Sequence, residues 1–303
     1  MNMPMHLSRF VVVLASALLA GCSSDPTADA GTGDEKVTTW GEDFIEKEIP
    51  SDPTGEGGFV DGWTLHYDKF LVSHHSVLFG DSAGKVAASM PGARFVDNTK
   101  PGRKVLASFT GLEAKAWDKV EYSIEPAVAD AVVVAGSADD LAMMVKHGYS
   151  LYVEGSATKT GPGGELVRRT FHWGFTTATR YFDCHYEADG KDTEGVVITN
   201  GGTDTTELTT HGDHFFYDRL QSSPDPAIKT SLRFEEKAAA DDPPNGDGDG
   251  EITLEELDRQ LIDVTKYDPS GLPAPTLGAF IAALARTVGH YRGEGECTIG
   301  RVP

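Results

Sequence analysis

Short runs of alternating apolar and polar residues, separated by glycine-rich turns, dominate the chain from about residue 58 to residue 222. Successive side chains of a strand point to opposite faces, so this alternation predicts half-buried β-strands. Runs with strand composition are 63–72, 76–79, 104–110, 118–125, 131–135, 150–158, 166–175, 195–200 and 207–217. Their regular spacing predicts an antiparallel β-sandwich domain over residues 58–222.

Helical spacing of apolar residues replaces this alternation after Asp218. Apolar residues three and four positions apart lie on one face of a helix. Such spacing occurs over 254–264 and 276–290, and residues 227–240 are also compatible with a helix. The sequence therefore predicts a mainly β protein followed by a small helical unit over residues 223–303.

The N-terminus has the layout of a secretory signal peptide. Arg9 precedes an apolar run over residues 10–20, which is shorter than the roughly 20 residues of a spanning helix. The run ends in Leu19-Ala20-Gly21-Cys22, which resembles the lipobox of bacterial lipoproteins. This resemblance implies removal of residues 1–21 and a diacylglycerol lipid on Cys22. An ordinary signal peptide with an unrelated cysteine is the alternative.

A lipid on Cys22 would anchor the protein to a lipid membrane of the cell envelope, facing the periplasm or the exterior. Ser23 follows Cys22, whereas the usual signal for inner-membrane retention is Asp at that position. We therefore expect the outer membrane. Residues 22–57 are rich in Ser, Asp, Gly, Thr, Pro and Glu, a composition that predicts a flexible tether.

The formal net charge of −21 excludes nucleic acid as a partner and favours attraction of cations. The chain contains no His-Glu-x-x-His or phosphate-loop motif. We therefore expect a non-enzymatic binding or structural protein. Cys184 and Cys297 remain once Cys22 carries the lipid, and an oxidising compartment favours a disulfide between them. Two unpaired thiols, or joint binding of a metal, are the alternatives.

A twelve-residue segment between the first two predicted C-terminal helices resembles the EF-hand calcium loop. Ca²⁺ takes oxygen ligands, which an EF-hand loop supplies from positions 1, 3, 5, 7, 9 and 12 around a glycine at position 6. Here the glycine is Gly250. The ligand positions are Asn245, Asp247, Asp249, Glu251 (through its backbone carbonyl), Thr253 (through a water) and Glu256. The resemblance implies a calcium site, which outside the cytosol would be permanently filled and structural.

Two departures from the EF-hand pattern affect this expectation. Asn245 replaces the usual Asp, which removes a charge and should weaken calcium binding. Pro243 and Pro244 stand where the entering helix would run, so that helix should be displaced. Asp241, just before the loop, is expected as a helix-end or outer-shell acid. An acidic turn that binds no ion is the alternative.

Histidines provide a second candidate metal site, because imidazole is a good ligand for copper and zinc. His211 and His214 can meet across the turn at Gly212-Asp213, so they form the best candidate pair. Neighbours His74 and His75 lie in a predicted strand and point to opposite faces, so they cannot share an ion without a bulge. Surface or hydrogen-bonded histidines are the alternative in each case.

Four short segments are similar to those of the MbnP-like periplasmic proteins, which accompany copper handling in some bacteria. They are 70–73, 111–122, Phe171-His172-Trp173-Gly174-Phe175, and a late strand that ends near His211, within residues 58–217. The resemblance implies a β-sandwich and a copper site built from His and Trp, here His211 and Trp173. The calcium loop is not part of that pattern. The alternative function is therefore a periplasmic copper- or zinc-binding accessory protein that uses His211 and His214.

Overall fold

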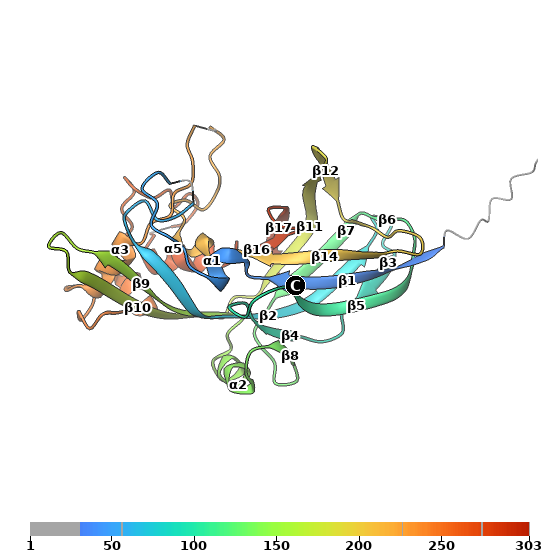
Figure 1. Ribbon diagram of the computed structural model, residues 1–303, viewed down its shortest axis with the longest axis horizontal. Helices are drawn as coiled ribbons and strands as arrows, with labels where there is room; N and C mark the ends of the chain where they lie inside the picture. Colours follow the sequence, from blue (N-terminus) through green and yellow to red (C-terminus); the bar gives the residue numbers. More distant parts are fainter. Residues whose placement is uncertain (1–30, 56, 226, 274, 303) are drawn as a thin grey trace, which may run out of the picture.

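The computed structural model describes residues 31–55, 57–225, 227–273 and 275–302 (Figure 1). The predicted signal peptide and Cys22 lie outside the described residues. Strands dominate the described part, which confirms the prediction of a mainly β protein with a small helical part. Within the described ranges, none of the helices has the length and apolar character needed to cross a membrane.

Two sheets hold most of the strands. The smaller sheet has the strand order β16 (Gly289–Tyr291), β14 (Thr203–Thr210), β1 (Thr32–Trp40) and β5 (Lys104–Glu113). The larger has the order β12 (Lys191–Glu194), β11 (Thr179–Ala188), β7 (Lys119–Ile124), β2 (Thr64–Gly80), β9 (Leu151–Thr160), β10 (Leu166–Phe175) and β15 (Glu251–Ile252). Beside this path lie β3 (Val86–Ser89), β4 (Arg94–Asp97), β8 (Val132–Ala135) and β17 (Glu296–Arg301). A separate pair joins β6 (Ala116–Trp117) to β13 (Val196–Val197).

The helices are short. They are α1 (Glu42–Glu46), α2 (Ala138–His147), η1 (Asp213–Phe216), α3 (Glu235–Ala238), η2 (Ala239–Asp241), α4 (Leu254–Arg259) and α5 (Leu277–Leu284). The longest of these is α2, which Gly148 ends in the left-handed conformation. The three helices predicted after residue 223 are each reduced to one or two turns.

The long strand β2 connects the two halves of the molecule that Figure 1 shows. Its first part, Thr64 to Val72, pairs with β9, and its second part, His74 to Gly80, pairs with β7. Most pairs are antiparallel, as predicted. Three are parallel, namely β1 with β14, β4 with β8, and β10 with β15, so the sheets are not those of a purely antiparallel sandwich.

The flexible tether predicted over residues 22–57 is wrong from residue 31 onward. β1 lies inside that stretch and pairs with both β5 and β14. Its polar residues misled the composition argument, because Val37 is fully buried and Thr38 and Thr39 lie between two partner strands, where the backbone ladder stabilises the strand.

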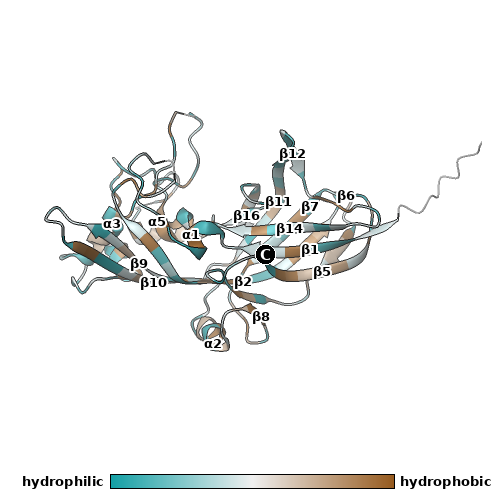
Figure 2. Cartoon of the chain, viewed as in Figure 1, coloured by the Kyte–Doolittle hydropathy of each residue, from teal (hydrophilic) through white to brown (hydrophobic). Residues whose placement is uncertain are grey.

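The separate helical unit predicted over residues 223–303 also differs from the structure. The last strands return to the sheets, since β16 pairs with β14 and β17 pairs with β11. One apolar core includes Trp173 of β10, Phe215 of η1 and Phe280 of α5. Hydrophobic residues alternate with polar ones along the strands that face this core (Figure 2). The C-terminal segment is therefore packed onto the β fold and shares its core.

Candidate functional site

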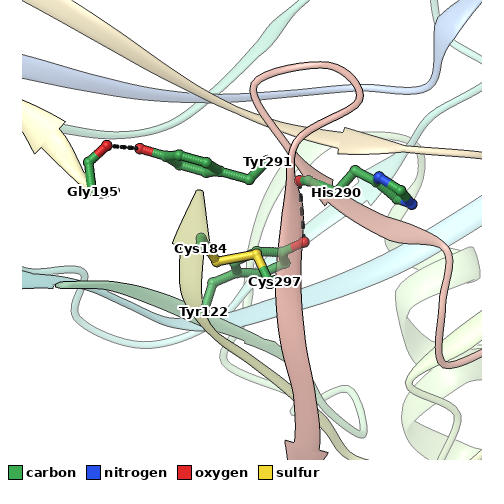
Figure 3. The surroundings of a disulfide bond; sticks show 6 residues. All are labelled: Tyr122, Cys184, Gly195, His290, Tyr291 and Cys297. Carbon is green, nitrogen blue, oxygen red and sulfur yellow. Dashed lines mark hydrogen bonds between the residues drawn. A yellow bond between two sulfur atoms is a disulfide. The ribbon is translucent and has the colours of Figure 1, made fainter. Parts of the chain in front are cut away.

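A disulfide between Cys184 and Cys297 fixes the last strand to the middle of the chain, and this confirms the predicted pairing. Cys184 lies in β11, and Cys297 lies in the neighbouring strand β17. In Figure 3 the disulfide sits beside Tyr122, whose hydroxyl donates a hydrogen bond to the backbone carbonyl of His290. The imidazole of His290 points away from the Tyr291 ring, as expected for neighbours in a strand (Figure 3).

His290 of β16 belongs to the histidine cluster, which consists of His211, His214 and His290. The ring centroids of His211 and His290 are 4.3 Å apart, those of His214 and His290 are 4.9 Å apart, and those of His211 and His214 are 5.3 Å apart. The three side chains belong to buried residues, with exposed fractions of 4%, 7% and 6%. Antiparallel pairing of Thr209 with His290 brings β16 beside the β14–η1 corner.

Acidic side chains surround the histidine cluster. Glu42 lies 3.6 Å from the His211 ring, and oxygens of Glu42 and Glu294 lie with a His211 nitrogen within 4.8 Å of one another. Asp213 forms a similar group with His211 and His214. Burial raises the pKa of Asp213 to about 6 and that of Glu42 to about 7, with neighbouring carboxylates adding to both effects. A cation placed here would relieve this repulsion.

Burial lowers the pKa of each clustered imidazole below its usual value, because a charged ring would lose its solvation. For His214 the shift is large, and the neighbouring His290 and His211 add to it. The rings are therefore neutral at physiological pH, the state in which imidazole nitrogens can bind a metal.

The sequence predicted that His211 and His214 lie close together, and they do, but it did not indicate His290. The structure does not bring Trp173 to them. Its indole N–H donates to the carbonyl of Ile252 at 2.8 Å, and its ring packs against phenylalanines. Among the described residues, no ring contact joins Trp173 to a histidine. The pairing of His211 with Trp173 that the MbnP-like resemblance implies is therefore not what the geometry favours.

The second candidate site is the acidic loop, defined as residues 241–256. It runs from the last residue of η2 into the first turn of α4. Carboxylate oxygens of Asp241, Asp247 and Asp249 all lie within 4.8 Å of one another. Glu256 accepts a long hydrogen bond of 3.4 Å from the backbone N–H of Asp247, so its carboxylate reaches the same turn. Gly250 has a φ of 94°, which lets the chain reverse where the EF-hand pattern requires it.

Asp241 occupies the place at which the sequence suggested Asn245. The Asn245 amide donates to the Gln260 side chain at 2.8 Å and is held beside the end of α4. Asp241 is fully buried, accepts from the Gly250 N–H at 3.1 Å and pairs with Arg169 at 3.1 Å. The signal for this was the Pro243-Pro244 pair, since an interrupted entering helix lets an earlier acid fold back over the loop.

The other predicted loop residues shape the start of α4. Thr253 accepts from the Glu256 N–H at 3.2 Å, and one Glu256 oxygen accepts from the Thr253 N–H at 2.8 Å. This reciprocal capping box fixes the Glu256 side chain while its second oxygen faces Asp247. The Glu251 side chain pairs with the His172 ring of β10 at 3.0 Å and so does not join the carboxylates of the loop.

The acidic loop is attached to the larger sheet through β15. Glu251 and Ile252 pair with Thr170 and Phe171 of β10, and the Thr170 N–H donates to the Gly250 carbonyl at 2.9 Å. Ile252 is fully buried. The acidic loop therefore pairs with a strand of the larger sheet through Glu251 and Ile252.

Other histidines, including His74 and His75, lie apart from the cluster. His74 is buried with neither ring nitrogen hydrogen-bonded among the described residues, while the His75 ring meets the Ser73 hydroxyl at 3.0 Å. The His185 ring lies 2.6 Å from Asp192 on the half-exposed β11–β12 hairpin.

No protein-family model matches this chain, and no curated protein or solved structure matches it either.

Proposed function

We propose that this protein is an exported lipoprotein that binds one calcium ion in the acidic loop and uses that ion as a structural element. The observation that supports the proposal most strongly is the convergence of Asp241, Asp247 and Asp249, with Glu256 opposite them. Carboxylate oxygens brought this close repel one another, and Ca²⁺ is the ion whose ligand preference fits a set of oxygens on a curled loop.

The attachment of the loop explains what a bound ion would do. Ion binding at 241–256 would hold η2 against α4, and the same segment carries Ile252 into the core and pairs with β10. Trp173 fixes the Ile252 carbonyl from the sheet side. The calcium ion would therefore join the helical part of the chain to the edge of the larger sheet, a structural or binding role. Reproducible turnover in a broad substrate screen would contradict it.

The test compares thermal unfolding in calcium and in chelator for the wild type, Glu256→Gln and Glu255→Gln. Gln retains the capping box at position 256 but lacks the charge that calcium requires. Glu255 is the matched control, because its side chain is 79% exposed and pairs only with Arg259 one turn along α4. A ligand at about 100 times its Kd stabilises the folded state by about 2.7 kcal/mol.

For a chain of this size, with an unfolding entropy of about 2.1 cal/mol/K per residue, that gain corresponds to a rise in Tm of roughly 4–5 °C in calcium. We expect this rise in the wild type and in Glu255→Gln and its loss in Glu256→Gln. Equal Tm values with and without chelator in the wild type would refute calcium binding. A full calcium response in Glu256→Gln would show that the ion binds elsewhere.

The membrane anchor is a separate part of the proposal and rests on the lipobox resemblance at Cys22. Cys22→Ser removes the thiol that would carry the lipid, so the variant should leave the membrane fraction and fail to incorporate a labelled fatty acid. Retention of Cys22→Ser in the membrane would contradict the anchor. The alternative predicted function, binding of copper or zinc, would use the histidine cluster and shares no residue with the acidic loop.

A further inference from the structure

The ring centroids of the histidine cluster lie near the separation expected of imidazoles that share one metal ion. Ligand atoms of His211, His214 and Asp213 already lie within 4.8 Å of one another, and the His290 ring has to turn for its nitrogen to join them. With metal–nitrogen bonds of about 2.0–2.1 Å in a tetrahedral arrangement, ring centroids of two ligands stand roughly 5 Å apart. The three separations in the cluster are 4.3, 4.9 and 5.3 Å. No pair is stacked in parallel, since the interplanar angles are 44°, 52° and 85°.

The polar atoms of this cluster are not satisfied by the protein around them. Nδ1 of His290 and Oδ1 of Asp213 are buried without a hydrogen-bond partner among the described residues. Among the described residues, the His211 ring makes a long 3.4 Å hydrogen bond to the Gly293 carbonyl and lies 3.6 Å from Glu42. A buried polar atom without a partner costs about 1–3 kcal/mol, so several at one point indicate a missing ligand. His214 is held in place by the Thr287 hydroxyl at 2.8 Å.

A simple packing role for the three rings explains these features less well. His74 shows what a lone buried histidine looks like in this protein, since it lies in the core with no metal-binding neighbour grouped with it in the described chain. The cluster differs because acids accompany the rings. Glu42, Asp213 and Glu294 all lie within ligand distance of His211, so the site favours a cation over an apolar contact.

The cluster is also accessible. A cavity of about 440 Å³ reaches it from the surface and is lined by His214, Tyr217, His290, Glu294 and Glu296. The acidic residues on this path would attract a cation toward the imidazoles. The disulfided Cys297 forms part of the same wall, so the wall is tied to β11.

We propose that His211, His214 and His290 bind one Zn²⁺ or copper ion through their imidazoles, with a carboxylate of Asp213 or Glu294 available as a fourth ligand. Three nitrogen donors favour zinc or copper over calcium or magnesium, which take oxygen ligands. The site shares no residue with the acidic loop. It therefore does not depend on the proposed calcium function, and it adds His290 to the pair that the sequence indicated.

The test is a calorimetric titration of calcium-saturated, metal-stripped protein with Zn²⁺, so that the acidic loop is already occupied. We expect one equivalent to bind to the wild type and at least tenfold weaker binding to His211→Gln, His214→Gln and His290→Gln. The control is His66→Gln, because the His66 side chain is 57% exposed and belongs to another part of the fold. Absence of binding to the wild type, or unchanged binding to His290→Gln, would overturn the proposal.

A second measurement needs no substitution and so remains valid where a variant fails to fold. Nuclear magnetic resonance of wild-type protein labelled in its histidine rings should show that Zn²⁺ moves the signals of three imidazoles, those of His211, His214 and His290. Cu²⁺ should broaden the same three signals. Perturbation of His66 or His185 in place of the cluster would contradict the assignment. A loss of calcium response with zinc binding intact would reject only the function proposed for the acidic loop.

Discussion

In the acidic loop the candidate ligands are carboxylates that follow one another within residues 241–256, on a turn that two glycines allow. In the histidine cluster the ligands are neutral rings from a strand–helix corner and from β16, far apart in sequence. The first arrangement suits a hard ion that the chain can wrap around. The second suits a softer ion that holds separate segments together. The two sites should therefore respond differently to changes in the fold that surrounds them.

Loss of the disulfide should have the largest effect. Cys184→Ala with Cys297→Ala opens a link between residues 113 apart in sequence, which for a loop this long costs about 4 kcal/mol of unfolding free energy. Urea unfolding measures this loss. Because β17 and Cys297 belong to the wall beside His290, the Kd for Zn²⁺ should rise, while the Kd for Ca²⁺ should stay within about twofold. Equal weakening of both ions would show that the sites are not independent.

A single buried carboxylate should behave unlike the clustered ligands. Burial raises the pKa of Glu35 to about 7; Asp204 opposes its ionisation, whereas Thr206 and Arg292 favour it, and Tyr291 lies near. The folded state thus holds the proton more tightly than the unfolded state, whose value is near 4.5. The contribution of Glu35 to stability should therefore be largest below pH 4.5 and should be lost as the pH rises through 7.

Glu35→Gln removes this dependence. Relative to the wild type, we expect the variant to be more stable by about 2–3 kcal/mol at pH 8 and nearly equal at pH 4. Chemical unfolding across this pH range measures the difference, and metal affinity at both sites should not change. A constant difference between Glu35→Gln and the wild type at every pH would contradict the assignment.

Trp173→Phe tests which site the aromatic core supports. Phenylalanine keeps the ring packing but removes the N–H that the Ile252 carbonyl accepts, so unfolding free energy should fall by about 1–3 kcal/mol. The Kd for Ca²⁺ should rise, because Ile252 belongs to the acidic loop. Calorimetry should show unchanged affinity for Cu²⁺ and Zn²⁺. A selective loss of copper binding would instead favour the His–Trp site that the MbnP-like resemblance implies.

The smallest expected change in Kd distinguishes two candidate ligands of the acidic loop, Asp241 and Asn245. Asp241→Asn should raise the Kd for Ca²⁺ about tenfold, or about 1.4 kcal/mol, because it removes a charge that lies with Asp247 and Asp249. Asn245→Ala should raise it less, since the Asn245 amide is directed to Gln260. A larger effect from Asn245→Ala would restore the EF-hand assignment that the sequence suggested.

The contrast between the sites also explains how much the sequence could predict. The acidic loop was visible because its acidic residues are periodic in one short segment, although Asp241 joins Asp247 and Asp249 in place of Asn245. His290 could not be found, since its approach to His211 depends on the return of β16 to β14, and no local pattern specifies that pairing. Residues 254–264 and 276–290 are less helical than their spacing suggests. Leu261 and Val264 are 76% and 70% exposed instead of packing on the core, and residues 289–291 join the sheet as β16.

The strands illustrate the same limit. Alternation located β9 and the second half of β10 well, because buried residues there alternate with more exposed ones. β2 was found by its strand-forming residues, since its middle, residues 70–74, is buried on both faces. Alternation missed β1, where polar residues are buried through strand pairing on both sides. The disulfide was predictable from the number of cysteines and the expected compartment, whereas its position beside the histidine cluster required the fold.

The central claim is that this chain carries two independent cation sites of different chemistry. Native mass spectrometry of metal-stripped protein, supplied with Ca²⁺ and Zn²⁺ together, tests it most directly. We expect one calcium and one zinc on each wild-type molecule, with only the calcium lost in Glu256→Gln and only the zinc lost in His290→Gln. A wild-type molecule that carries either ion but never both would contradict the account.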